Sequence, residues 1–348
     1  MRLLNSEDYE NLLIGSKILG CGGGGDPNKA RKYLEKLSKS KVRMINLDEL
    51  AENSKIFTVF MIGSSASEEK TPNTIFVAKD ELEKIVGKMD AIIPVEIGPG
   101  AVFEALNYAS EFDLPIVDAD IVGGRSAPEV YLETITIGKI KRTPMILVNS
   151  DNDMIILKNI DDWTRIEKIS RTFATVSGGY AYAVGYPMET GNVKNFLVKN
   201  SLTKSIELGN YIKNKNLREF FEKYGGKIIF KGILRKINKE NKGGFLIGDI
   251  EIDGKDEFTN SELEIWFKNE NLVSWINGKP YVTCPDLITI TDPEYNGIYN
   301  RDLKVGMEVS VIGMPADEIW SSKEGIKIFN PRIFGFNIDY TPIKFNSK

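Results

Sequence analysis

Two aspartates stand where an apolar segment of the chain ends. Asp118 and Asp120 follow residues 114–117, and side chains two residues apart point to the same side of a strand if the strand continues. Two close carboxylates can hold different pKa values, so that one serves as an acid and the other as a base, or they can bind a metal ion together. The structural alternative is a helix cap or an ion pair with Arg125. We favour a functional role for these two aspartates.

Further charged side chains follow in the same segment. Arg125 could bind a substrate carboxylate or an imide oxygen, because a guanidinium group presents several donors in one plane. Glu129, directly after Pro128, is either a further acid of the site or a helix cap. We take Arg125 and Glu129 as candidate catalytic residues beside the two aspartates.

Four consecutive glycines precede Asp26-Pro27, which predicts the start of a helix. Glycine permits positive φ and close approach to a ligand, and the N–H groups of such a loop can bind an anion or polarise a carbonyl. A helix rather than a strand precedes the loop, and the lysine of a phosphate-binding loop is missing, so nucleotide binding is disfavoured. A glycine-capped turn is the structural alternative. We predict substrate binding by Gly22, Gly23, Gly24, Gly25 and Asp26.

Cys21 ends the first predicted helix, directly before the glycines. A thiol near a helix N-terminus can have a lowered pKa and act as a nucleophile. The alternative is a small buried apolar side chain. Cys284 lies in the second half of the chain, and we interpret it as structural. We expect both cysteines to be reduced.

Two more loops follow predicted strands. Residues 56–62 lead into Gly63 and a stretch rich in serine and glutamate, and residues 91–95 lead into a loop with two glycines. Ligands of open parallel sheets bind beyond the carboxyl ends of the strands. In these loops we predict that the substrate-binding residues are Gly63, Glu69, Gly98 and Gly100. For Glu69, a solvated run of charges is the alternative.

Histidine is absent from the 348 residues. This excludes Ser-His-Asp triads, Cys-His pairs and histidine-ligated zinc, so proton transfer falls to Asp, Glu, Lys, Tyr, Cys or water. Any metal would be held by carboxylates, carbonyls or cysteine. The net charge is −4 without a dense basic cluster, so nucleic acid is not an expected partner. Without a long apolar run or a signal peptide, we expect a cytoplasmic protein that does not bind membranes.

Strands and helices alternate in the first half of the chain. This pattern predicts a three-layer α/β domain with a mainly parallel sheet. Pro94 favours an edge position or a bulge for its strand. The predicted helices are 6–19, 27–37, 80–89 and 101–110, and the predicted strands are 56–62, 91–95, 114–117, 134–137 and 145–148.

The pattern changes after about residue 170. A helical signal at 201–224 is followed by short strands with turns, and Asn277-Gly278 is a strong hairpin signal. The second half therefore predicts a β-rich, barrel-like domain. We expect an α/β domain at 1–170, which carries the glycine loop, and the β-rich domain at 171–348, with the boundary within 165–200. The predicted strands are 227–234, 244–252, 263–267, 272–276 and 307–311.

Several segments together resemble a known family. LGCGGGGDP, IGSSASEEK, IGPGA and PIVDADIVGGRSAPE look like the N-terminal domain of the S-methyl thiohydantoin desulfurase family. That family was long filed as a domain of unknown function beside hydantoinase and oxoprolinase genes. GGFLIGDIEIDG, IWFKNENL, CPDLITI, LKVGMEVSVIGMP and PRIFGFNIDY resemble its C-terminal domain in the same order. The resemblance covers nearly the whole chain and implies an α/β domain paired with a barrel-like domain.

The chain departs from the family pattern in two loops. Ile121, Val122 and Gly123 stand where the family usually has Gly-Met-Gly, and Ala127 precedes Pro128 where the family has phenylalanine. Residues 64–66 are Ser-Ser-Ala instead of Ala-Pro-Thr. The positions that match are Asp118, Asp120, Arg125, Pro128 and Glu129. These differences bear on the shape of the pocket and so on the substrate.

The resemblance implies hydrolysis of a five-membered hydantoin-type ring, in which water replaces a methylthio group. Under this hypothesis Asp120 is the base, Asp118 sets its pKa, and Arg125 binds ring carbonyls or developing charge together with the amides of Gly22 to Gly25. Cys21 as nucleophile is the variant mechanism.

Two other functions stay open. One is a cyclic amide hydrolase with a carboxylate-bound divalent metal, which is the one cofactor that the sequence allows us to consider. The other is a non-catalytic, ligand-binding or accessory subunit of a hydantoinase-type system. The expected partner is a small-molecule substrate, and a homo-oligomer is compatible with the sequence.

Overall fold

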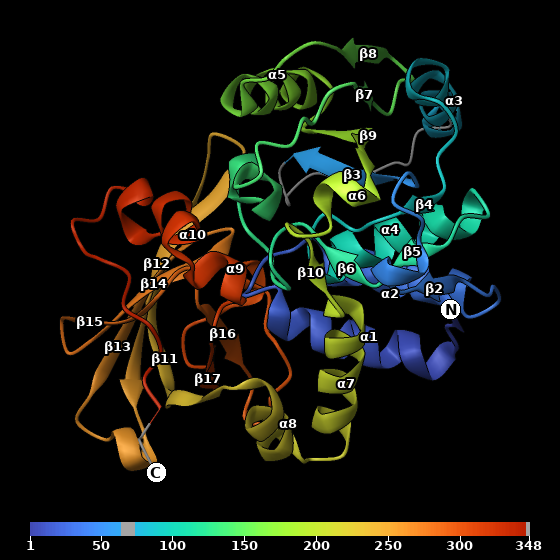
Figure 1. The fold of residues 1–348 in the computed structure, drawn as a ribbon. Helices are drawn as coiled ribbons and strands as arrows, with labels where there is room; N and C mark the ends of the chain where they lie inside the picture. The colour runs from blue at the N-terminus through green and yellow to red at the C-terminus, as the bar shows by residue number, and fades with distance from the viewer. Residues whose placement is uncertain (64–73, 346–348) are drawn as a thin grey trace.

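Two β-sheets of different topology divide the chain (Figure 1). The computed structural model describes residues 1–63 and 74–345. Within them, an eight-stranded mixed sheet, called sheet A, lies among helices, and a seven-stranded antiparallel sheet, called sheet C, lies beside it. A short two-stranded sheet joins β6 (Ala119–Asp120) to β10 (Val198–Lys199). No helix in these residues is long and apolar enough to cross a membrane.

Sheet A has the order β1-β2-β5-β4-β3-β9-β7-β8. The neighbours β2, β5, β4 and β3 pair in parallel, and this is the parallel part that the sequence predicts. The other strands pair antiparallel, since β9 inserts beside β3 and also pairs with the β7–β8 hairpin. The sequence analysis did not predict β8 or β9. The strands are β1 (Arg2–Leu3), β2 (Arg43–Ile45), β5 (Ile116–Val117), β4 (Ala91–Ile92), β3 (Lys55–Gly63), β9 (Tyr180–Glu189), β7 (Met145–Val148) and β8 (Met154–Leu157).

Three local predictions need correction. β4 is a central strand, and it ends at Ile92, so Pro94 lies beyond it and does not interrupt its ladder. Residues 134–137 do not form a strand, because Thr134 donates to the carbonyl of Ile121 and its own carbonyl accepts from the amide of Ile137 in a 3₁₀ turn. The helix predicted at 80–89 is α3 (Ile75–Val86).

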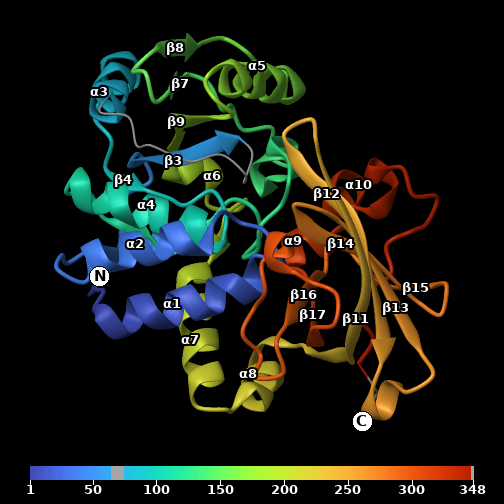
Figure 2. The same cartoon turned by 180° about the vertical axis from the view of Figure 1, so that it is seen from behind.

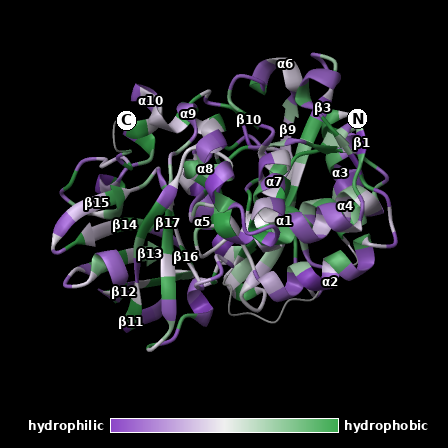
Figure 3. Cartoon of the chain, turned by 90° about the horizontal axis from the view of Figure 1, so that it is seen from below, coloured by the Kyte–Doolittle hydropathy of each residue, from purple (hydrophilic) through white to green (hydrophobic). Residues whose placement is uncertain are grey.

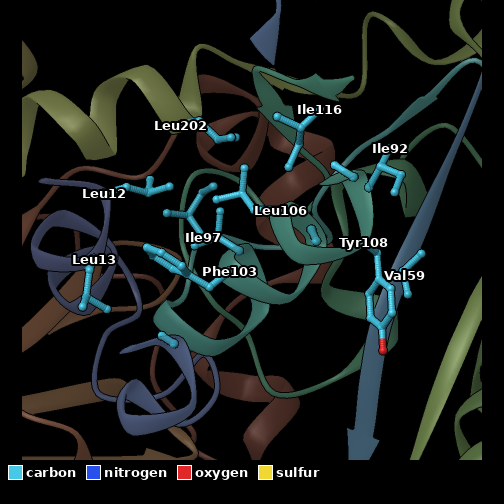
Figure 4. Packing of buried hydrophobic residues seen from close by; sticks show 14 of the residues in the cluster. Leu12, Leu13, Val59, Ile92, Ile97, Phe103, Leu106, Tyr108, Ile116 and Leu202 are labelled. Carbon is cyan, nitrogen blue, oxygen red and sulfur yellow. The ribbon is translucent and has the colours of Figure 1, made fainter. Parts of the chain in front are cut away.

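Helices cover both faces of sheet A and give three layers. α3 and α4 (Pro99–Glu111) share a core with Phe57 and Val59 of β3, whereas α5 (Trp163–Val176) shares a second core with Ile56 and Phe60. Consecutive side chains of β3 therefore point to opposite faces, and its mostly apolar residues stand out in Figure 3. The first core is shown in Figure 4, where α1 and α4 contribute Leu12, Leu13, Phe103, Leu106 and Tyr108.

Two further helices hold the glycine loop between them. α1 (Ser6–Leu19) has the predicted bounds and is capped by Asn5, and α2 (Pro27–Leu37) is capped by Asp26, where the sequence predicts the start of a helix. α7 (Ser201–Lys213) packs closely on α1, since a Cβ on Gly15 would lie 1.9 Å from the carbonyl oxygen of Ser205. α1 is therefore fixed along its length up to the start of the loop.

Sheet C has the order β15-β14-β13-β12-β11-β17-β16 and curls into a half-barrel. Its two edges approach each other, since the Asn271 side chain of β14, the second strand from one edge, donates to the Ile288 carbonyl of β16, the strand at the other edge, at 3.1 Å. The predicted Asn277-Gly278 hairpin is present, with positive φ at both residues. The strands are β15 (Lys279–Thr283), β14 (Glu270–Ile276), β13 (Glu262–Lys268), β12 (Phe245–Gly254), β11 (Lys227–Lys242), β17 (Glu308–Met314) and β16 (Leu287–Thr291).

The remaining helices connect the two sheets. After β17 the chain returns towards sheet A, and the Trp320 indole donates to the Val122 carbonyl at 2.6 Å. Residues up to β9 belong to sheet A, and sheet C begins at Lys227, while the boundary within 165–200 stays a prediction. These helices are α6 (Thr190–Val193), α8 (Leu217–Tyr224), α9 (Glu318–Ser321) and α10 (Lys323–Ile328).

Candidate active site

A cavity of about 160 Å³ lies where the α1–α2 loop meets sheet C. Its wall takes residues from this loop, from the ends of β3 and β4, from the segment after β6, from α5, and from β12, β14 and the segment before β17. Figure 2 shows the end of α1 that leads into the loop beside sheet C, in agreement with the contact between α1 and β16. Segments from both halves of the sequence therefore share one cavity.

The four glycines pack closely against both halves of the protein. Gly22, Gly24 and Gly25 have φ values of 87°, 79° and 86°, which side chains other than glycine rarely adopt. Gly23 has no such φ, but a Cβ on it would lie 2.1 Å from Oε1 of Glu270. A Cβ on Gly24 would lie 2.4 Å from Cα of Gly98. Backbone conformation and the lack of space for a Cβ therefore both require glycine here. This explains why the loop has four glycines, more than a simple helix–helix turn needs.

Backbone hydrogen bonds fix this loop to both halves. The carbonyl of Cys21 accepts from the amide of Asn271, and that of Gly22 accepts from the amide of Asn300, both at 2.8 Å. On the other side, the carbonyl of Gly24 accepts from the amide of Gly100 at 2.9 Å. The loop is thus a rigid joint that brings sheet C against the helix α4 of the α/β half.

Two glutamates from different halves line the cavity beside this joint. Glu270, 2% exposed, begins β14, and its Oε1 accepts from the amide of Gly24 at 3.1 Å. Glu96 follows β4, and its Oε2 accepts from the amide of Ala127 at 3.2 Å. Burial, opposed by the charge of Arg125, raises the pKa of Glu270 to about 8.

The pKa of Glu96 depends on its neighbour. Burial and then the charge of Glu270 raise the pKa of Glu96 well above its ordinary value. Because the two carboxyls are coupled, the loss of one proton makes the loss of the second less favourable. A carboxyl group that is still protonated near pH 7 and a carboxylate beside it is an arrangement suited to acid–base catalysis.

The other acidic residues of the wall each have a basic partner. Glu133 is held by buried Arg142 at 2.6 Å, although burial raises the pKa of Glu133 to about 7. The partners are Asp26 with Arg301 at 3.2 Å, Glu104 with Lys29 at 3.2 Å, Glu129 with Lys268, and Glu167 with Arg171. Among the described residues, Glu96 and Glu270 alone of the wall's acids have no ion-pair partner.

Comparison with known sequences divides the chain into two matched regions. The profile described as S-Me-THD-like, N-terminal domain, matches residues 7–159, and the profile described as S-Me-THD-like, C-terminal domain, matches residues 160–343. The chain belongs to the S-Me-THD-like family. A search of curated proteins finds no match.

A solved structure has the same fold as this S-Me-THD-like chain. It is the X-ray crystal structure of a protein from Chromobacterium violaceum, a structural genomics target. The TM-score is 0.82 at 22% sequence identity, and the match covers 99% of this chain and 100% of the other. At this identity the likeness establishes the fold and nothing about activity.

The two aspartates of the S-Me-THD-like motif do not line the cavity. Oδ1 of Asp118 accepts from the amides of Leu202 and Thr203, both at 3.0 Å, and so caps α7. Asp120 is fully buried and accepts from the three amides of residues 122–124 at 2.8–2.9 Å. Burial raises the pKa of Asp120 to about 7, although these amides oppose the rise. Both carboxylates thus hold the segment in place, and catalysis by them stays a prediction.

Arg125 and Cys21 also lie outside the cavity wall. Arg125 is fully buried and donates to the carbonyls of Pro285 and Asp286 in sheet C, so its guanidinium connects the two halves of the protein. Cys21 is fully buried, its Sγ lies 3.4 Å from the carbonyl oxygen of Leu19, and burial raises the pKa of its thiol. A raised pKa disfavours the thiolate that a nucleophile needs.

The other predicted residues gather around the cavity. Gly22 to Asp26 line it, and so do Gly63, Gly100 and Glu129. Gly98 packs against Gly24 behind the wall. Glu69 lies outside the described residues. The convergence of three loops at one edge of sheet A is therefore present, whereas the acids that line the cavity differ from those of the motif.

Sequence reasoning missed Glu96, Glu270, Glu133, Glu167 and Arg171 as site residues. Glu96 stands in a loop that was already singled out, so its position after a strand was an available signal. Glu270 stands between two asparagines in a β-rich segment, and nothing in that pattern indicates burial against a loop far away in the sequence. In the part of the chain that the structure describes, no group of three or more Asp, Glu or Cys is arranged to hold a metal ion.

Proposed function

We propose that the protein hydrolyses a five-membered hydantoin-type ring, with water replacing a methylthio group. Membership of the S-Me-THD-like family supports this reaction class. The observation that carries the proposal is the coupled pair Glu96 and Glu270 in a cavity at the junction of the two halves. This pair supplies an acid and a base without histidine, which the chain lacks.

The two carboxyl groups have different roles in proton transfer. Near pH 7 the two carboxyls together retain a proton, because the charge of one raises the pKa of the other. The protonated carboxyl gives its proton to the ring nitrogen next to the C–S bond, which makes that carbon more electrophilic. The carboxylate takes a proton from the attacking water. We assign the base role to Glu270, whose pKa burial raises to about 8, and the acid role to Glu96, because the charge of Glu270 raises the pKa of Glu96 well above its ordinary value.

The bond changes balance with water alone. The oxygen of water bonds to the ring carbon, the C–S bond breaks, and the methylthio group leaves with a proton as methanethiol. The ring keeps a carbonyl at that carbon. Gly25 and Asp26 also line the cavity, and their amides make no hydrogen bond with other described residues, so they can donate to a ring carbonyl oxygen.

Matched amide variants test this assignment. Glu270→Gln and Glu96→Gln keep the size of the side chain and its acceptor for Gly24 or Ala127, but they cannot transfer a proton. We expect methanethiol release from an S-methyl thiohydantoin, measured with a thiol reagent, to fall about 10²- to 10⁴-fold in each variant. Circular dichroism checks that the variants are folded.

Asp120→Asn is the comparison that separates this assignment from the one based on the motif. We expect its rate per folded molecule to stay within about tenfold of the wild type, since Asp120 bonds to its own loop. A near-wild-type rate for Glu270→Gln together with a large loss for Asp120→Asn would return the base to Asp120. The metal-dependent and accessory-subunit functions stay predictions, tested by chelation and by a turnover panel of hydantoins.

A further inference from the structure

The charges of the cavity wall leave one place unmatched. Asp26, Glu104, Glu129, Glu133 and Glu167 each contact a lysine or arginine, and those basic groups are thereby committed. Glu96 and Glu270 have no such partner among the described residues. Lys29, Arg171 and Arg301 are the basic residues of the wall, and each forms an ion pair with one of these acids. Within the described residues the wall therefore carries more acid than base, and the excess lies at this pair.

One oxygen of the Glu270 carboxyl has no hydrogen-bond donor in the part of the chain that the structure describes. Its Oε1 accepts from the amide of Gly24, but its Oε2 is buried and has no partner. The charges of Arg125 and Arg171 lower the pKa of Glu270, yet neither forms an ion pair with it. A buried carboxylate oxygen without a donor is costly, so a ligand that supplies one is favoured. An unpartnered oxygen on a cavity-lining side chain thus points to a ligand rich in N–H groups.

We propose that Glu96 and Glu270 bind the ring as a planar, five-membered amidinium-type cation, a class that includes protonated cyclic isothioureas and cyclic guanidines. The inference rests on the proposed function, because it takes the same cavity as the ring site. It adds that the site selects cationic rings over neutral rings of the same size and rejects anionic ones. N–H groups in one plane on either side of the amidinium carbon match the two carboxyl groups, which ionise as the cation binds and then form charge-assisted pairs with it.

This cation is also the species on which water acts. When the proton of Glu96 moves to the ring nitrogen, the ring becomes an isothiouronium ion and Glu96 becomes a carboxylate beside it. The opposite charges then replace a neutral pair in a poorly solvated cavity, where their attraction is strong. The contact between the carboxyl pair and the protonated ring therefore both recognises the cation and activates the C–S bond.

Binding of non-reacting probes tests the inference without turnover. The probes are 2-aminoimidazoline, a cation at pH 7, and imidazolidin-2-one, a neutral ring of the same size. Calorimetry on the full chain should give a dissociation constant about tenfold to a hundredfold lower for the cation. In Glu270→Gln the cation should lose this advantage, while the affinity of the neutral ring stays within about twofold. Glu264→Gln, exposed on the neighbouring strand β13, is the control and should keep the preference.

The outcomes separate the two proposals. Equal affinity for the two rings in the wild type, or an unchanged preference in Glu270→Gln, overturns the cation site even if S-methyl thiohydantoins are hydrolysed. A cation preference without hydrolysis supports the binding site and counts against the proposed reaction. Displacement of the cation by low-millimolar Mg²⁺ or Mn²⁺ would assign the carboxyl pair to a metal and overturn the inference.

Discussion

Glu270→Gln should make the protein more stable, and more so as the pH rises. In the folded protein burial raises the pKa of Glu270 to about 8 from an ordinary value of 4.5. Between these two pH values the unfolded chain gives up the proton and the folded protein retains it, so wild-type stability falls as the pH rises through this window. Glutamine carries no proton to lose and can still accept from the amide of Gly24.

The size of the effect follows from the pKa difference. At 1.36 kcal/mol per pKa unit, Glu270 destabilises the wild type by about 1 kcal/mol at pH 5, about 3 kcal/mol at pH 7 and about 5 kcal/mol at pH 9. Taking about 2.1 cal/mol/K of unfolding entropy per residue for 348 residues, the variant should melt about 1 °C, 4 °C and 6 °C above the wild type.

Thermal melts of both proteins at the three pH values, in buffers of equal ionic strength, measure this difference. Asp120 and Glu133 also have raised pKa values, but they are present in both proteins, so their contributions to stability cancel in the comparison. Glu264→Gln should melt within about 1 °C of the wild type throughout, because it is an exposed substitution. A variant that melts with the wild type at every pH, or that loses its advantage at pH 9, would show that Glu270 is not held protonated.

Three further predictions follow from the joint around the cavity. Gly23→Ala should lower the free energy of unfolding by about 2 kcal/mol or more in a denaturant titration and abolish turnover, because its Cβ would lie 2.1 Å from Oε1 of Glu270. A fully active variant would contradict this contact. Cys21 should react with a thiol reagent only after unfolding, since it is fully buried, and rapid labelling of the folded protein would revive it as a nucleophile. Asp118→Ala should destabilise the protein by about 1–2 kcal/mol, because α7 loses its cap. KM should stay unchanged, and a raised KM would show that the carboxylate contacts the substrate.

Local patterns predicted most of the elements that surround the cavity. β3 is an apolar run, Asp26-Pro27 starts α2, and Asn277-Gly278 turns a hairpin, because each depends on a few adjacent residues. β9 was missed, since its place in sheet A depends on pairing with β3, which lies more than a hundred residues earlier. Such pairing is decided by burial in the folded chain and leaves little trace in the segment itself.

The acids that line the cavity were harder to predict than the loops. Asp118 and Asp120 have the spacing of an acid–base pair. However, the carboxylate of Asp118 accepts from amides at the start of α7, and that of Asp120 accepts from amides of its own loop. Glu270 is the reverse case, because its surroundings in the sequence are ordinary and its burial comes from contact with the glycine loop. The chemistry of a carboxyl group depends on its solvation and neighbours, which only the folded chain defines.

The lack of histidine and the run of glycines are both related to the raised pKa of Glu270. In a chain without histidine, the proposed reaction needs carboxyl groups that retain a proton near pH 7, and burial without a basic partner is the direct way to raise their pKa values. Such burial requires backbone to approach the carboxyl closely, with an amide as its donor in place of a lysine or arginine. Gly23 leaves the room and Gly24 supplies the amide, and both come from the half of the protein opposite to Glu270. The glycine loop therefore acts on the chemistry through Glu270, by setting how strongly that carboxyl retains its proton.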